Sequence, residues 1–337
     1  MREMQIQFSD VGKVDFTSFD LPVPERLGWD ELLLRTEYTL ISPGTEMDCL
    51  MNRAGGDVYP KVLGYSAVAR VEDRGEGSSE FEIGDRVLVY HSAHRSRLLK
   101  KKQDVVKVPG GLDPKEAIFA VVGCMGFQGV RKVRPELGEA FLVAGLGLLG
   151  LIASRCAVLS GAFPLIVTDF NEKRRAIARS YGADYAFSPD EPGLFEKVHG
   201  LTRGGKGVAC AVEVTGSPQA LLDVLKMTAP FGRVALVGCS RTPTKEIDFY
   251  KYVHRPCIQL LGGSNLVRPA CDSHPGCWTM RDDMTVLMEL MLAKKLDVRP
   301  LLTVVEKPEN AVSVYERFIS RDPDMLGAVF DWNGVTA

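Results

Sequence analysis

The sequence lacks a strong excess of either charge. Its 337 residues include 41 Lys and Arg against 43 Asp and Glu, which gives a net charge of −2. A nearly neutral chain has no broad positive field to attract nucleic acid or an anionic membrane. Its basic cluster, RSRLLKKK at 95–102, is short and indicates a solvated surface or a neighbour of a cofactor phosphate. We therefore expect no nucleic acid and no membrane among the partners.

Long apolar runs and a paired cysteine framework are also absent. The segment FLVAGLGLLGLIA at 141–153 contains glycines and is shorter than the roughly 18 residues of a membrane-spanning helix. The first residues, MREMQIQFSD, alternate like a strand and lack the apolar core of a signal peptide. The eight cysteines are scattered along the chain. These features predict a cytoplasmic protein whose cysteines are mostly buried free thiols.

The spacings of common metal sites are missing too. The chain contains neither C-x2-C nor H-E-x-x-H, and no cysteine or carboxylate stands beside His91 or His94. A structural zinc ion usually takes four ligands from Cys and His side chains. The sequence therefore gives no support for a structural zinc site.

The first 110 residues predict a mostly β domain. Short apolar segments alternate with turn residues such as PVPERLG, RGEGSS and PGGLDP. The expected strands are MQIQF, VDFTSF, ELLLRTEYTLI, VLGYSAVARVED, DRVLVYH and VVKVP. Strands of this length and spacing favour a small barrel.

A different pattern begins at residue 139. Six apolar strands alternate with helices that we expect over 148–160, 171–181, 193–202 and 218–228. In a parallel sheet, helices cover both faces, so the strands are apolar along their whole length. The pattern therefore predicts a parallel, doubly wound sheet. After residue 265, NLVRPACDSHPGCWTM predicts a loop, and a helical segment and two strand-like segments follow. We expect a dinucleotide-binding domain over 123–265 and a β-rich domain formed by 1–122 and 266–337.

The sequence GLGLLG follows the first apolar strand of this second pattern. Its Gly145, Gly147 and Gly150 have the GxGxxG spacing of a dinucleotide-binding turn. The first glycine permits a tight turn, the second lets the backbone approach a pyrophosphate, and the third allows close packing of helix on strand. The N–H groups of the helix that begins at Leu148 and Leu149 would then face the phosphates.

Asp169 ends the next strand and determines the expected cofactor. A carboxylate there accepts hydrogen bonds from the adenosine ribose and repels a 2′-phosphate, which favours NAD. Because Arg174 and Arg175 lie just beyond, NADP remains possible, and Asp169 could instead serve only as a helix N-cap. Contacts to the ribose and nicotinamide are expected where later strands end, at Thr215, Gly238, Ser240 and Gly263.

This organisation resembles the medium-chain dehydrogenase/reductase superfamily, the alcohol dehydrogenase-like proteins with a GroES-like domain. The likeness covers nearly the whole chain, and its markers are ISPGTE at 41–46, LGYSAVARV at 63–71, GDRV at 84–87 and the glycine turn. The resemblance implies an α/β protein with a GroES-like β-barrel catalytic domain and a six-stranded Rossmann domain. It also implies a homodimer formed through the edge strand CIQLLGG, which would cover an exposed strand edge.

The chain departs from the zinc-bearing members of the superfamily at the residues that would hold the catalytic metal. Pro43 replaces the first Cys, Tyr65 and Ser66 replace the His-Glu pair, and only Cys124 keeps a possible ligand type. A catalytic zinc site needs about three protein ligands. The combination of SPGTE with GYS looks like a zinc-lacking bacterial branch, similar to the bacteriochlorophyllide dehydrogenases. We therefore expect a nicotinamide cofactor and no zinc.

Without a metal, a side-chain donor must stabilise the alkoxide that develops during hydride transfer. Tyr65 stands at the position of the metal-binding His, and Thr45 matches the hydroxyl that relays the substrate proton in relatives. His94 could exchange protons with solvent, and Glu46 either acts directly or orients its neighbours. The structural alternatives are a Tyr65 that caps the barrel core, a Thr45 that only forms a turn and a His94 on the surface.

Three functions follow as hypotheses. The first is a metal-independent, NAD(H)-dependent oxidoreductase that interconverts an alcohol and a carbonyl on a medium-sized, possibly sugar-like small molecule. The second is an enone or quinone reductase, in which the same donor polarises the oxygen while hydride goes to carbon. The third is a protein that binds NAD(H) as a sensor or structural component without catalysis.

Overall fold

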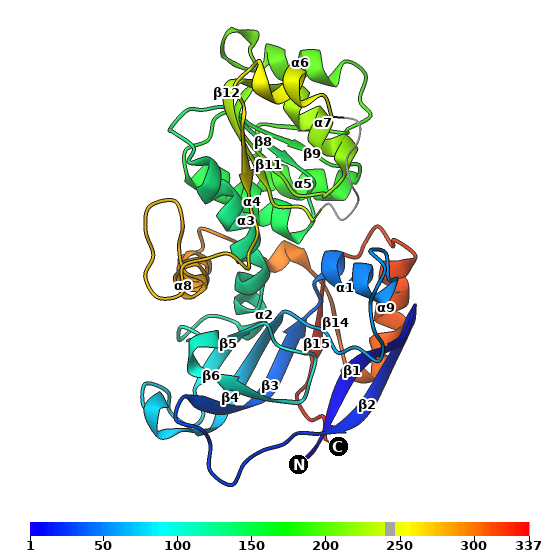
Figure 1. Cartoon of the computed structure of the whole chain (residues 1–337), viewed down its shortest axis with the longest axis vertical. Coiled ribbons are helices and arrows are strands. Elements are labelled where there is room, and N and C mark those ends of the chain that lie inside the picture. The colour runs from blue at the N-terminus through cyan, green and yellow to red at the C-terminus, as the bar shows by residue number, and fades with distance from the viewer. Residues whose placement is uncertain (240–246, 337) are drawn as a thin grey trace. The chain divides into compact units, whose positions relative to one another are not determined.

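The computed structural model describes residues 1–239 and 247–336, and these form two compact units (Figure 1). The first unit comprises Met1–Val122 with Met284–Ala337, and the second comprises Gly123–Asp283. The second boundary differs from the expected break at 265/266. The reason is that residues after 265 are attached to helix α3 (Phe119–Val133), where Arg268 donates a 2.9 Å hydrogen bond to the carbonyl of Cys124.

The second unit contains the predicted parallel sheet. Its strands have the order β10-β9-β8-β11-β12-β13, and all neighbours are parallel. The bounds are β8 (Phe141–Ala144), β9 (Leu165–Thr168), β10 (Tyr185–Phe187), β11 (Val208–Glu213), β12 (Thr228–Leu236) and β13 (Gln259–Gly262). Every residue of the central strands β8 and β9 is buried, as expected for strands covered on both faces. The order reverses between β8 and β11, where such sheets bind ligands.

Helices cover both faces of this sheet (Figure 1). They are α4 (Leu148–Leu159), α5 (Glu172–Ser180), α6 (Leu194–Gly200) and α7 (Pro218–Met227), and a π-helical turn spans Tyr250–His254. Helix α4 contacts α5, and α6 contacts α7. All four helices lie within a few residues of the expected ranges, because strand–helix alternation leaves a strong hydrophobic signal in the sequence.

The first unit is mostly antiparallel β structure. Its seven-stranded sheet has the order β14-β15-β3-β4-β5-β7, with β6 also paired to β3, and β1 pairs with β2 separately. The bounds are β1 (Arg2–Asp10), β2 (Lys13–Asp20), β3 (Glu31–Leu40), β4 (Ser66–Arg74), β5 (Arg86–Tyr90), β6 (Arg97–Lys101), β7 (Val105–Lys107), β14 (Leu302–Glu306) and β15 (Gly327–Asp331). Together with the six-stranded parallel sheet, this unit confirms the predicted fold class.

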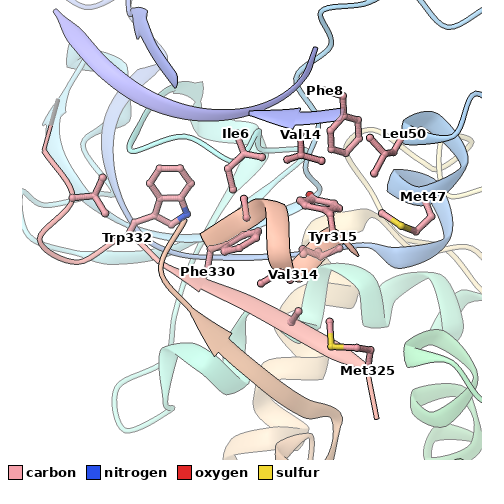
Figure 2. Close-up of a cluster of buried hydrophobic side chains, with 14 residues drawn as sticks. Ile6, Phe8, Val14, Met47, Leu50, Val314, Tyr315, Met325, Phe330 and Trp332 are labelled. Atoms are coloured by element: carbon pink, nitrogen blue, oxygen red, sulfur yellow. The ribbon is translucent and has the colours of Figure 1, made fainter. Parts of the chain in front are cut away.

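The helices of the first unit are short, and two of them contribute residues to one core cluster. They are α1 (Pro43–Leu50), α2 (Pro114–Ala117) and α9 (Ala311–Ile319), while α3 and α8 (Met280–Leu292) cross the two unit boundaries. Figure 2 shows Phe8, Met47, Tyr315, Phe330 and Trp332 in this cluster, so residues from both ends of the chain share a core. Within the residues described here, no helix is long and apolar enough to cross a membrane.

The structure differs from the expectations at several elements. Helix α1 lies where a turn was one alternative, and α9 was not expected at all. Strand β4 begins at Ser66 rather than Val62, because Gly64 has φ +143° and interrupts the extended backbone. The basic cluster at 95–102 contains β6, and Arg97 forms ion pairs with Glu3 and Glu72. It is therefore a paired surface strand.

The cysteines are less uniformly buried than expected. Cys49, Cys124, Cys156 and Cys210 are buried, whereas Cys239, Cys257 and Cys271 are exposed and Cys277 is intermediate. The exposed cysteines lie in loops or turns, where a neighbouring apolar sequence does not ensure burial. Burial raises the pKa of the Cys210 thiol to about 12.

Candidate functional site

The glycine turn between β8 and α4 has the geometry that its spacing predicts. Gly145 has φ +94°, which only glycine adopts readily, and its N–H donates a 2.8 Å hydrogen bond to the carbonyl of Thr168 on β9. A β-carbon on Gly150 would lie 1.9 Å from the Gly145 oxygen, so α4 packs against the turn with no room for a side chain. A β-carbon on Gly147 would meet nothing within 4 Å. The backbone at Gly147 is therefore open to an approaching ligand.

The first turn of α4 supplies N–H groups next to this opening. The first intrahelical hydrogen bond runs from Leu151 to Gly147 at 3.0 Å, so the N–H groups of Leu148 and Leu149 precede it. No side chain from residues 1–239 or 247–336 caps this helix terminus. A helix N-terminus of this kind attracts phosphate through its N–H groups and its dipole.

Asp169 lies directly beside the glycine turn. Its Oδ2 accepts the N–H of Leu146 at 2.7 Å, and its Oδ1 accepts the N–H of Asn171 at 2.8 Å. Each oxygen keeps a lone pair, so the carboxylate can still accept ribose hydroxyls. Asn171, not Asp169, caps α5 by accepting from Lys173 and Arg174. The alternative of Asp169 as the N-cap is therefore wrong.

The arginines beyond Asp169 already make contacts within the protein. Arg175 forms an ion pair with Glu172 and donates to the backbone carbonyl of Asp169. The backbone N–H of Arg174 donates to Asn171. A 2′-phosphate here would therefore meet the Asp169 carboxylate, and the guanidinium of Arg175 is already paired.

The end of β11 is held by a residue that the sequence analysis missed. Glu213 is 3% exposed, and its carboxylate accepts hydrogen bonds from the N–H groups of Thr215 and Gly216 and from the Thr215 hydroxyl. Burial raises the pKa of Glu213 above its ordinary value. The sequence feature that could have predicted this role is a carboxylate at the end of a buried strand, two residues before Thr-Gly.

The strand ends of β8, β11 and β12 approach one another closely. A β-carbon on Gly145 would lie 2.6 Å from the Thr215 methyl group, and one on Gly238 would lie 2.1 Å from the nitrogen of Gly216. The structure thus brings together Thr215 and Gly238 with the glycine turn. Gly263 follows β13 and donates to the carbonyl of Leu236, whereas Ser240 lies outside the described residues.

In the first unit, Tyr65 and Thr45 both keep partial solvent exposure. Thr45 lies in the first turn of α1, and Tyr65 lies immediately before β4. The Tyr65 ring contacts the ring of His91, with centroids 4.9 Å apart. The neighbouring Ser66 hydroxyl is buried, and it has no hydrogen-bond partner within the described part of the chain. The two adjacent residues therefore have different surroundings: the Ser66 hydroxyl is enclosed, whereas Tyr65 keeps partial solvent exposure.

His94 and Glu46 are buried in the core of the first unit, at 1% and 0% exposure. The expectation that His94 exchanges protons with solvent is wrong, because one ring nitrogen lies 2.7 Å from the Thr39 hydroxyl and the other 3.1 Å from Glu46. The burial of His94 could not be predicted from its position after a strand. It arises because the segment that follows β5 packs against β1, where the N–H of Ile6 donates a 2.9 Å hydrogen bond to the His94 carbonyl.

His91 is the histidine that lies beside Tyr65. Its backbone has φ +48°, a conformation that is uncommon for residues other than glycine. The Tyr90 ring packs against it at 4.1 Å, and Lys100 donates to its carbonyl oxygen. Partial desolvation and then the charge of Lys100 lower the pKa of His91 below 6.5. The imidazole is therefore mostly neutral at neutral pH.

The residues at the family's metal-binding positions do not fit a zinc ion. Proline has no donor side chain, and Tyr65 and Ser66 carry hydroxyls rather than imidazole and carboxylate. Of these four residues only Cys124 carries a side chain that commonly binds zinc, and it is fully buried. No group of three His, Cys, Asp or Glu side chains that could hold a metal occurs among residues 1–239 and 247–336.

The loop SHPGCWT is anchored to helix α3 in the second unit. The Arg131 guanidinium lies 3.7 Å from the centroid of the Trp278 ring and 3.0 Å from Asp283. The Trp278 ring therefore packs on this arginine. Beside it, Phe127, Arg131, Arg134 and Gly276 help to line a cavity of about 240 Å³, which contains none of the predicted site residues.

The model of the zinc-binding dehydrogenase family matches residues 149–264. L-threonine 3-dehydrogenase from Pyrococcus furiosus is 29% identical over 208 residues, with 53% of this chain and 59% of that protein covered. D-guloside 3-dehydrogenase from Escherichia coli is 24% identical over 273 residues, which are 80% of this chain and 77% of that protein. The chain thus spans only about 59% of the length of the first of these relatives.

Solved structures share the fold over almost the whole chain. A crystal structure of an Escherichia coli oxidoreductase/dehydrogenase of unknown specificity has a TM-score of 0.84 and 18% identity, with 98% of this chain and 99% of that one covered. At this identity the likeness concerns the fold alone. The family match over residues 149–264, the curated relatives and the shared fold make the chain similar to the medium-chain dehydrogenases, the alcohol dehydrogenase-like proteins.

Proposed function

We propose that this protein is an NAD(H)-dependent oxidoreductase that interconverts an alcohol and a carbonyl without a metal ion. The geometry of the glycine turn carries this proposal, because Gly147 leaves the backbone open beside the N-terminus of α4. The relatives are dehydrogenases by name, and the donor set at the metal positions does not suit zinc. The cofactor supplies or accepts the hydride when it is bound.

We propose NAD rather than NADP as the preferred cofactor. Asp169 is held in place by the N–H groups of Leu146 and Asn171, so its negative charge cannot turn away from an added phosphate. Arg175 is paired with Glu172 and does not offset that charge. A fixed carboxylate at this strand end is typical of NAD-binding domains.

Tyr65 and Thr45 are the proposed proton-handling residues. In the reducing direction the carbonyl carbon gains a hydride, and the oxygen must gain a proton. The phenol of Tyr65 can donate that proton, while the Thr45 hydroxyl can hydrogen-bond to the same oxygen. The neutral imidazole of His91 beside Tyr65 helps to fix the orientation of the phenol ring.

A sugar-like or polyol-like small molecule is the proposed substrate class. This part of the proposal relies on the resemblance and on D-guloside 3-dehydrogenase, a relative whose name refers to a sugar derivative. The structure adds one consistent feature: the proposed donors are hydroxyl groups, which hydrogen-bond readily to the hydroxyls of such a substrate.

The proposal is tested by measuring kcat and KM of the wild type and of Tyr65→Phe with NAD or NADH. The substrates are a panel of sugars, polyols, enones and quinones. We expect carbonyl reduction by the wild type and a loss in kcat of at least about 100-fold in the variant. Tyr38→Phe, on strand β3, is a matched control that should retain activity. Full carbonyl reduction by Tyr65→Phe would exclude the phenol as donor, and turnover of enones alone would favour the reductase hypothesis. NADH binding without turnover would favour a sensor.

Elemental analysis tests the metal-free part separately. We expect less than about 0.1 zinc per chain, because a catalytic site needs about three ligands. One zinc per chain that persists through dialysis against a chelator would overturn the proposal.

We also propose a homodimer formed through β13, the last strand of the sheet order. Within the part of the chain that the structure describes, β13 pairs only with β12, so its other edge can pair with a second copy. Light scattering should give about twice the 37.0 kDa of one chain. A mass of one chain at micromolar concentration would exclude the dimer.

A further inference from the structure

A closed polar cluster lies inside the apolar core of the first unit. The Glu46 side chain is fully buried, and its Oε1 accepts the N–H of Ser42 at 2.7 Å. Its Oε2 accepts the hydroxyl of Tyr315 and lies 3.1 Å from Nε2 of His94. Burial and then Glu46 raise the pKa of Tyr315 well above its ordinary value, so the phenol keeps its proton and donates it to the hydrogen bond. The carboxylate thus accepts from three different segments of the chain.

The cluster continues through His94 to Thr39 and Trp332. The indole N–H of Trp332 donates to the Thr39 hydroxyl oxygen at 2.8 Å, and that oxygen lies 2.7 Å from Nδ1 of His94. Because Trp332 can only donate, the Thr39 hydroxyl is free to donate to Nδ1, and Nε2 of His94 then donates to Glu46. In this arrangement every polar side chain of the cluster has a hydrogen-bond partner. A buried network of this kind makes the surrounding structure rigid.

Two backbone contacts connect this cluster to the proposed proton-handling residues. Ser42 is the N-cap of α1, so the hydrogen bond from its N–H to Glu46 fixes the helical turn that contains Thr45. On the other side, the backbone N–H of His94 donates to the carbonyl of Leu63 at 3.0 Å, two residues before Tyr65. Thr45 and Tyr65 are therefore attached to opposite ends of one Glu46–His94 contact.

We propose that Glu46, His94 and Tyr315 are positioning residues that set the distance between the Thr45 and Tyr65 hydroxyls. This inference rests on the proposed function of those two hydroxyls. None of the three needs to touch the substrate, because all are buried in the core of the first unit. Figure 2 shows Tyr315 in the core near Phe8 and Val14, and Trp332 in the same cluster near Ile6.

The proposal predicts a specific defect when only a hydroxyl is removed. Tyr315→Phe keeps the ring and its edge-to-face contact with Phe8, 5.2 Å between centroids, but leaves Glu46 with one donor fewer. We expect kcat for carbonyl reduction to fall about 10- to 100-fold, because small displacements of reacting groups have effects of this size. The KM and Kd for NADH should not change, since the cofactor binds to the other unit.

Hydrogen exchange gives a readout that does not depend on activity. In Tyr315→Phe, amides of the first turn of α1 and of residues 63–65 should exchange at least about 10-fold faster, while strands β4 and β5 stay protected. Val314→Ala is the matched control: Val314 is buried on the same helix, but it makes no polar contact, so the variant should lose thermal stability and retain kcat.

The outcomes separate the two proposals. If Tyr315→Phe and Val314→Ala lower kcat equally, or if α1 exchange is unchanged in Tyr315→Phe, the cluster is structural only and the positioning role is refuted. If the wild type turns over no alcohol or carbonyl, the proposed function fails instead. The exchange experiment then still decides whether Glu46 and Tyr315 hold these two segments together.

Discussion

The backbone oxygen of Gly145 occupies the space that a β-carbon on Gly150 would need, with a separation of 1.9 Å. The turn and the helix that follows it are therefore in contact through backbone atoms alone. Gly147, between them, has the opposite surroundings, because a β-carbon there would meet no atom of the described residues within 4 Å. The three glycines of the turn thus have separable roles, and two substitutions can distinguish them.

Gly150→Ala should destabilise the folded protein, whereas Gly147→Ala should impair only cofactor binding. The first forces backbone atoms apart, which costs about 1 to 3 kcal/mol or more. The second fits the protein but places a methyl group where a pyrophosphate would approach. Thermal unfolding and NADH fluorescence titration measure the two effects. A Gly147→Ala protein with wild-type affinity for NADH would contradict the assignment of this turn to the cofactor.

Asp169→Asn should shift the cofactor preference toward NADP. The amide keeps the shape of the side chain but removes the charge that repels a 2′-phosphate, and it weakens a charge-assisted hydrogen bond worth about 1.5 to 3 kcal/mol. We expect the ratio of kcat/KM for NADH over NADPH to fall at least about 10-fold. Because both cofactors are measured on one variant, a general loss of stability cancels from the ratio. An unchanged ratio would mean that Asp169 serves the turn only.

Asp283→Asn should destabilise the second unit strongly. The Asp283 carboxylate is fully buried between Arg131 and Arg268, and its loss leaves two guanidinium groups without their counter-charge. Breaking such a buried pair costs about 3 to 5 kcal/mol. The control is Asp297→Asn, because Asp297 pairs with Arg299 at the surface, where a pair contributes about 1 kcal/mol or less. Denaturant titration of both variants should show the difference.

Glu213→Gln should become more stable relative to the wild type as the pH rises. Burial raises the pKa of Glu213 above 4.5, so the folded protein holds this proton more tightly than the unfolded chain does. That contribution to stability is present below pH 4.5 and is lost as the pH rises through the raised folded pKa. The glutamine has no proton to lose. The free energies of unfolding of the wild type and the variant, measured at about pH 4 and pH 8, test this prediction. A difference between the two proteins that is the same at both pH values would contradict it.

The second unit was largely predictable from sequence because its signals are local. Buried parallel strands appear in the sequence as continuous apolar runs, and GLGLLG between β8 and α4 marks the proposed cofactor turn in one short segment. Asp169 follows from its position at the end of the next strand. Glu213 was missed because its role depends on a turn that folds back on its own strand, which spacing alone does not reveal.

The first unit was less predictable because its contacts join distant segments. Tyr315 meets Glu46, and Trp332 meets Thr39, across almost the whole length of the chain. A lone histidine after a strand, such as His94, has no local feature that separates a surface position from a core position. Likewise His91 reaches Tyr65 only because β4 and β5 are paired in one particular register.

Strand β15 pairs with β3 in the sheet of the first unit, although the whole second unit lies between them in the chain. During synthesis, residues 123–283 are therefore complete before β3 can pair with β15, although its other partners, β4 and β6, are made much earlier. One position in the sheet of the first unit therefore stays empty until β15, which ends at Asp331, has been synthesised. The unit that begins first in the chain is thus the last to have all of its strands.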